Sequence, residues 1–216
     1  VLLLDDNPNP TDPRVKAQLN TTRALGQDIM KLLAKPHKRF ADALSTFEKE
    51  QQHNSVVKSS TIKKLANHYT WAADTLTTMA DNEKIEDHVD EFFAEQVLRS
   101  LAKELKLTAE ALTLSTTEGA KLPVSRVREL YRRLTWTFNA ELVVFERKNY
   151  ASLSHEANKA MNLNSYIGLM GSAYRQEQTP DGMVLIPVTK RAADLIVPDS
   201  DFLLTLDADS ILLREY

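Results

Sequence analysis

The sequence predicts a mixed α/β protein in which short apolar strands frame a large helical block. Continuous apolar runs lie near both ends of the 216-residue chain, at 1–4 and 202–206, and such runs are typical of buried parallel strands. From residue 14 to residue 140, apolar side chains instead recur at helical spacing. Glycine is scarce, with 5 residues, which favours helices over a sheet with many tight turns.

The composition is that of a chain that forms a hydrophobic core, because 43% of the residues are hydrophobic and 26% are charged. A net charge of -3 argues against a broad surface for nucleic acid or an anionic membrane. The absence of cysteine excludes disulfides and thiolate metal sites. No apolar run approaches the roughly 20 residues that a membrane helix needs. We therefore expect a soluble chain, and its start within an apolar run without Met suggests an excerpt from a longer protein.

The first predicted strand covers Val1–Leu4 and ends in two carboxylates, Asp5 and Asp6. The next residues, 7–10, are Asn and Pro in alternation, which is typical of a loop. The strand therefore delivers both carboxylates to its carboxyl end, the edge where open α/β sheets bind ligands.

The helical block begins at Asp12 and Pro13, which suit the N-cap and the first position of a helix. Pro36 should interrupt this helix. Further helices are predicted at about 40–47, 62–79 and 89–105, with a shorter one capped by Thr108 and a last one opened by Pro123. We expect five or six helices and no strand in this block.

After residue 140 the apolar residues no longer recur at helical spacing. The pattern predicts a strand at 142–145, a helix from about Ser154 to Gly171, and a polar loop at 174–182. Residues 183–186 fit either a short strand or an extended segment, and 202–206 fit a second buried strand. That strand ends in Asp207-Ala208-Asp209, so two apolar strands each end in paired carboxylates.

In one parallel sheet, Asp5, Asp6, Asp207 and Asp209 would lie along the same edge and repel one another. A divalent cation resolves this conflict, and oxygen ligands suit Mg²⁺ or Mn²⁺ rather than zinc. The alternative is that these Asp residues are ordinary turn formers. For Asp5 and Asp6 alone the turn interpretation is favoured, and for the Asp-Ala-Asp segment the two are about even.

Lys159 lies in the first turns of the helix predicted after residue 154. A lysine there is unfavourable for the helix dipole but suits a phosphate held near the helix. Taken by itself, a solvated surface lysine explains the position better.

Three motifs in this order resemble those of the family 2 glycosyltransferases of the GT-A fold. The motifs are Leu-Leu-Leu-Asp5-Asp6, then Lys159-Ala-Met161-Asn-Leu-Asn, then Phe202-Leu-Leu-Thr-Leu-Asp207-Ala-Asp209-Ser. The resemblance is closest to the processive synthases of the cellulose, chitin and hyaluronan type, which make polysaccharides. Met161 departs from the pattern, since the family usually has Gly there.

The resemblance implies a partial GT-A, Rossmann-like domain that binds a nucleotide sugar, with a large all-helical insertion. Asp5 and Asp6 would hold the uridine or its ribose, Lys159 would approach the diphosphate, and Asp207 would bind the UDP-sugar. Asp207 and Asp209 would also hold Mg²⁺ or Mn²⁺ (a DxD motif). The parent protein would transfer the sugar to an acceptor hydroxyl at the cytoplasmic face of a membrane.

The predicted domain division places residues 1–13 and 141–216 in the nucleotide-sugar-binding part and residues 14–140 in the insertion. The catalytic base would follow residue 216, so the chain alone should be inactive. Two other functions remain open at this point. One is a helical module for partner binding or oligomerisation on a degenerate α/β scaffold, and the other is a metal-dependent nucleotidyltransferase.

Overall fold

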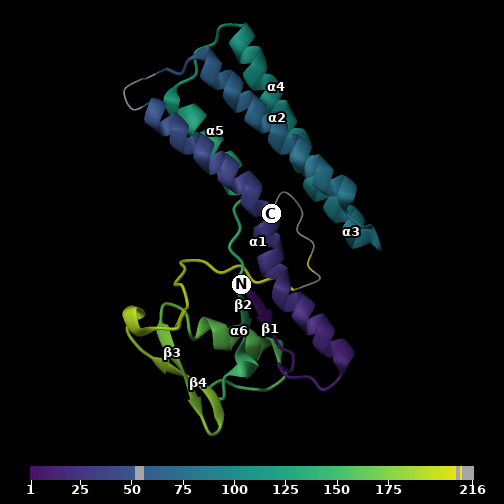
Figure 1. Ribbon diagram of the computed structural model, residues 1–216, viewed down its shortest axis with the longest axis vertical. Helices are drawn as coiled ribbons and strands as arrows, with labels where there is room; N and C mark the ends of the chain where they lie inside the picture. Colours follow the sequence, from purple (N-terminus) through teal and green to yellow (C-terminus); the bar gives the residue numbers. More distant parts are fainter. Residues whose placement is uncertain (52–55, 208–209, 211–216) are drawn as a thin grey trace. The chain divides into compact units, whose positions relative to one another are not determined.

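The computed structural model describes residues 1–51, 56–207 and 210 of the chain. It is a mixed α/β protein, mostly helical, with one small parallel and one small antiparallel sheet (Figure 1). The chain divides into two compact units. Val1–Lys31 and Glu141–Asp207 form the first, and Leu32–Ala140 form the greater part of the second. The long helix α1 (Pro13–Glu50) contributes to both units.

The parallel sheet of the first unit pairs β1 (Leu2–Leu4) with β2 (Val144–Glu146). In their register Leu3 lies opposite Phe145. The segments predicted as strands at 1–4 and 142–145 thus lie side by side in one parallel sheet, a pairing that the sequence analysis left open. Phe145 is buried in the smaller core of the protein, so the pairing also places an apolar side chain from β2 inside this unit.

A second sheet of three antiparallel strands has the order β4–β3–β5. Its strands are β3 (Ala173–Thr179), β4 (Gly182–Pro187) and β5 (Leu195–Ile196), with a 3₁₀ turn, η3 (Lys190–Ala192), before β5. Of the two interpretations left open for residues 183–186, the structure shows the strand. The loop predicted at 174–182 is wrong, because polar residues 175–178 form an exposed part of β3.

The buried strand predicted at 202–206 is also wrong, because these residues form no strand. Phe202 is 92% exposed and Leu204 is 76% exposed. An apolar run becomes a buried strand only where a sheet edge pairs with it, and no described strand does so here. The sheets of the described residues accordingly do not form a Rossmann-like sheet.

Helix α1 begins at Pro13 as predicted, but it passes through Pro36 without a break. In the first unit it is held by Arg23, whose Nε and Nη2 donate to the two carboxylate oxygens of Glu146, both at 2.6 Å. Gly26 allows α1 to approach the segment before β2, because a Cβ atom at this position would lie 3.1 Å from the Cβ of Leu142. The helix is thus fixed against the strand that follows the second unit in sequence.

The second unit is all-helical, as predicted for this part of the chain. After α1 it contains α2 (Ser59–Asn82), α3 (His88–Phe92), a π-helical turn η1 (Phe93–Arg99), α4 (Ser100–Thr117) and α5 (Val124–Thr137). Helix α2 packs along α4 (Figure 1). The separate helix predicted from Thr108 is wrong, since α4 runs through that residue. Pro123 does precede the last helix, as predicted.

The larger hydrophobic core lies wholly within this unit, and its buried members run from Phe40 to Phe138. A buried hydrogen bond joins α2 to α5, because the Tyr69 hydroxyl donates to the carbonyl of Leu130 at 3.0 Å.

Both tryptophans of the chain belong to this unit. Trp71 lies under the guanidinium of Arg39, 4.4 Å from the ring centre, and Trp136 is 69% exposed. Among the described helices, none is long and apolar enough to cross a bilayer.

Candidate functional site

The carboxyl ends of β1 and β2 bring opposite charges together rather than carboxylates alone. Because the strands are parallel, Asp5 after β1 and Arg147 after β2 reach the same edge of the sheet. Nη2 of Arg147 donates to Oδ1 of Asp5 at 2.5 Å. Nζ of Lys148 lies 3.4 Å from the same oxygen and also donates to the backbone carbonyl of Asp5. Two cations therefore balance the charge of the Asp5 carboxylate.

The guanidinium of Arg147 is fully buried and has further partners in the chain that follows β2. Its Nη1 donates to the carbonyl of Ser154, and its Nη2 donates to the carbonyl of Glu156. Burial of a charge is costly unless it is paired and hydrogen-bonded. Here one carboxylate and two carbonyls supply the partners, although Nε has none among the described groups.

Lys159 is the first residue of α6 (Lys159–Ile167), so its predicted place in the first turn of a helix is confirmed. The helix starts later than the predicted Ser154, because the Ser154 and Glu156 carbonyls bind Arg147. Asn158 is the N-cap instead, and its side chain accepts from the amides of Ala160 and Met161. Such caps satisfy amide groups that have no partner within the helix.

The ammonium group of Lys159 forms an ion pair with the carboxylate of Asp207. The two side chains are 68% and 51% exposed, so the pair is accessible from solvent. The contact brings the second and third predicted motifs together within the first unit. Asp207 reaches Lys159 although the segment before it is not a strand.

Of the remaining predicted site residues, Asp6 is described by the structure and Asp209 is not. Asp6 follows Asp5 and is exposed. Asp209 lies outside the described residues, so the prediction that it binds a metal stays a prediction. In the described part of the chain, no three His, Asp or Glu side chains gather into a possible metal site. Of the two predicted metal ligands, Asp207 is the one that the structure describes, and its carboxylate pairs with the ammonium group of Lys159. A divalent metal would bind through the same negative charge.

Two cavities are lined by none of the four described motif residues. The larger, about 640 Å³, belongs to the first unit and is lined by β2, by β5 and by the rings of Tyr150 and Tyr166. Its volume is within the range of about 300–1,000 Å³ that is usual for ligand pockets. Neither Asp5, Asp6, Lys159 nor Asp207 lines it, so the motif residues lie on other surfaces of the same unit.

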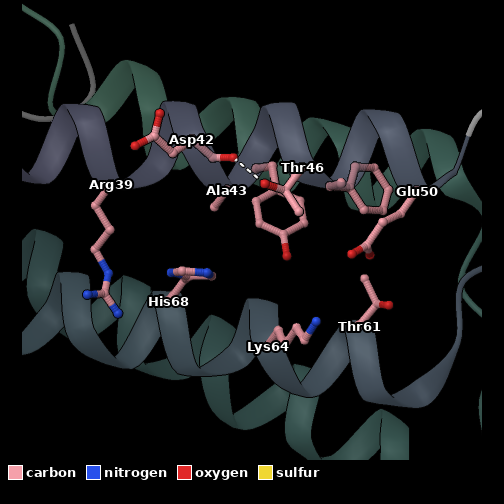
Figure 2. Close-up of a pocket in the computed structure, with 10 residues that line it drawn as sticks. Arg39, Asp42, Ala43, Thr46, Glu50, Thr61, Lys64 and His68 are labelled. Carbon is pink, nitrogen blue, oxygen red and sulfur yellow. Dashed lines mark hydrogen bonds between the residues drawn. The ribbon is translucent and has the colours of Figure 1, made fainter.

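The second cavity, about 280 Å³, is a trough between α1 and α2 in the helical unit. Figure 2 shows Arg39 and His68 at one end and Glu50 facing Thr61 at the other, with Lys64 between them. In the described part of the chain these charged groups form no ion pair with one another, and each charged side chain faces solvent. The trough has charges of both signs, which selects no ligand class.

Comparison with protein-family models, with curated proteins and with solved structures finds no match to this chain. The site is therefore interpreted from its own residues.

The sequence analysis missed Arg147 as a site residue. The signal was available in the sequence, because a basic pair, Arg147-Lys148, follows the second predicted strand just as an acidic pair follows the first. When two parallel strands end at one edge, oppositely charged pairs at those ends are expected to meet.

Proposed function

We propose that this chain is part of the catalytic domain of a family 2 glycosyltransferase with a GT-A fold. It would bind a nucleotide sugar, most simply a UDP-sugar, together with Mg²⁺ or Mn²⁺. The full-length protein would transfer the sugar to an acceptor hydroxyl in polysaccharide synthesis at the cytoplasmic face of a membrane. The observation that carries the proposal is the order of three motifs, whose residues Asp5, Lys159 and Asp207 also belong to one compact unit.

The charges of these residues support distinct roles. Asp6 is exposed and next to the anchored Asp5, so its carboxylate is available for the hydroxyls of a ribose. Lys159 would give its ammonium group to the diphosphate, and Asp207 would hold the metal with Asp209. A bound divalent cation would stabilise the negative charge of the leaving diphosphate. Lys159 adds a positive charge on the same side, because it already lies against Asp207.

The binding part of the proposal is tested by calorimetric titration of the chain with UDP, with and without Mn²⁺. We expect Mn²⁺ to strengthen UDP binding, and we expect Asp207→Asn or Asp209→Ala to abolish that strengthening. Asp201→Asn, an exposed carboxylate nearby in the sequence, is the matched control and should behave as wild type. Equal UDP affinity in the wild type and both site variants would contradict the metal assignment. Tighter binding of UTP than of a UDP-sugar would favour a nucleotidyltransferase.

A further inference from the structure

Among the described residues of the first unit, Arg147 is the charged side chain that is completely buried. Among the described residues, the other buried polar side chains are the uncharged Gln51, Thr61 and Asn162. A buried arginine weakens a fold unless its donors are satisfied, and a hydrophobic residue in its place is often no less stable. Its presence therefore suggests a task that an apolar side chain could not perform.

The contacts of Arg147 connect the segment after β1, which is distant in sequence, with the segment before α6, which follows Arg147 by fewer than ten residues. It follows β2, its Nη2 holds the carboxylate after β1, and its two terminal nitrogens hold the carbonyls of Ser154 and Glu156. The second of these carbonyls lies two residues before the N-cap Asn158 and three before Lys159. One planar group thus sets the distance between Asp5 and the start of α6. A lysine could not reproduce this, because its single ammonium group lacks the fixed fork of the guanidinium.

We propose that Arg147 is a positioning residue for the nucleotide site, acting by fixing Lys159 and the first turn of α6 relative to Asp5 and Asp6. This inference rests on the proposed function, since it assigns Arg147 to the same site. Arg147 does not itself contact the nucleotide. It pre-orders the segment 154–158, so that the charge of Lys159 does not have to be brought into place when the diphosphate binds. Groups that orient binding residues in this way typically contribute about 10- to 100-fold in affinity.

The test compares Arg147→Lys with Lys148→Met in the full chain. Arg147→Lys keeps a positive charge beside Asp5 but gives up the bonds to the two carbonyls. Lys148→Met removes a cation from Asp5 but touches neither carbonyl. We expect Arg147→Lys to weaken UDP binding by about tenfold or more and to speed amide hydrogen exchange at residues 157–163. Lys148→Met should change both much less than Arg147→Lys does, because Arg147 still holds the carbonyls of Ser154 and Glu156.

A second control separates positioning from general stability. Leu185→Ala removes a side chain from the smaller core of the same unit and should lower the melting temperature without changing UDP affinity at a temperature well below it. If Arg147→Lys binds UDP as the wild type does, or if Leu185→Ala loses as much affinity as Arg147→Lys, the positioning role is wrong. If wild type does not bind UDP at all, the proposed function fails. The exchange rates at 157–163 still decide whether Arg147 orders this segment.

Discussion

His68 is placed where protonation is unfavourable. Its ring lies between those of Phe40 and Tyr131, at centre distances of 5.9 and 6.1 Å. Its Nδ1 is buried without a partner among the described groups. Burial lowers the pKa of His68, and the positive charge of Arg39 lowers it further. The unfolded chain therefore takes up this proton more readily than the folded chain, so neutral His68 favours the folded state. This contribution to stability is complete above about pH 6.5, the ordinary pKa of histidine, and is lost as the pH falls.

We accordingly expect the melting temperature of the chain to fall between pH 7 and pH 5, and the His68→Gln variant to show a smaller fall. Thermal melting followed by circular dichroism at several pH values measures both. His37→Gln, in α1, is the control and should keep the wild-type pH dependence. An unchanged pH dependence in His68→Gln would show that other groups cause the acid sensitivity.

If Asp207 binds a metal as we propose, Lys159 would compete with that metal for the carboxylate. In the free chain its ammonium group lies against the carboxylate that we assign to the metal. Lys159→Met should therefore bind Mn²⁺ alone more tightly, by only a few-fold because exposed ion pairs are weak. The same variant should bind UDP less tightly in the presence of Mn²⁺, because the diphosphate loses a cation.

Paramagnetic resonance of free Mn²⁺ and calorimetry with UDP measure these two opposite changes. Lys190→Met, an exposed lysine of η3, should alter neither. A fall in both affinities would show that Lys159 supports metal binding rather than competing with it.

The sequence identified Lys159 and Asp5 but not the residue that connects them. The type and spacing of a side chain reveal a motif along the chain, whereas Arg147 depends on which strands pair. The strands at 1–4 and 142–145 were each predicted, but their pairing was not. Given the parallel pairing of β1 with β2, the meeting of the two charged pairs follows. The bonds from Arg147 to backbone carbonyls could not, because any residue type can supply a carbonyl.

At the scale of elements, α1 shows how tertiary packing overrides a local breaker. Proline inside a helix costs about 3 kcal/mol, since it removes a hydrogen bond and clashes with the carbonyl four residues earlier. Here Pro36 is buried, and Leu32, the residue with that carbonyl, is 58% exposed. Burial of the proline ring therefore offsets part of the cost of the missing hydrogen bond.

Replacing Pro36 with Ala should stabilise the protein. The helix regains its hydrogen bond, while two buried methylenes are lost at about 0.8 kcal/mol each, which leaves a net gain of about 1 kcal/mol. The melting temperature should rise by a few degrees. Lys35→Ala, at the exposed neighbouring position, is the control and should leave it nearly unchanged. A lower melting temperature in Pro36→Ala would mean that the ring is needed for packing.

The strands were predicted less well than the helices, for a physical reason. A helix satisfies its backbone within one segment, so the periodicity of apolar residues suffices to find α2 and α5. A strand depends on a partner elsewhere. The polar segment in β3 therefore forms a hairpin with β4 although its side chains look like a loop. The two-residue Pro180-Asp181 turn, followed by Gly182 at the start of β4, was the better signal. The apolar segment 202–206 has no such partner.

At the scale of the whole molecule, the helical unit has what it needs to fold alone. Its larger core runs from Phe40 to Phe138 and includes no residue from the first unit. We expect residues 14–140 expressed alone to be helical by circular dichroism and to melt cooperatively. Residues 141–207 alone lack β1 and Asp5, the partners of β2 and Arg147, and should not fold. A disordered product from residues 14–140 would show that the helices depend on the rest of the chain.

The predicted division of the chain began the insertion at residue 14, where the helical period starts. Periodicity cannot show that the first half of α1, up to Lys31, packs with the strands, as Arg23 and Gly26 do. A single helix can serve two cores, because its hydrogen bonds do not depend on which core its side chains enter.

The position of Trp71 and Trp136 decides what intrinsic fluorescence can report. Both indoles belong to the helical unit, so their emission follows unfolding of that unit. The first unit contains no tryptophan, so its own unfolding has no indole signal. A single Tyr150→Trp substitution would place an indole beside the larger cavity of this unit, and its signal would report on the unit that holds the proposed site.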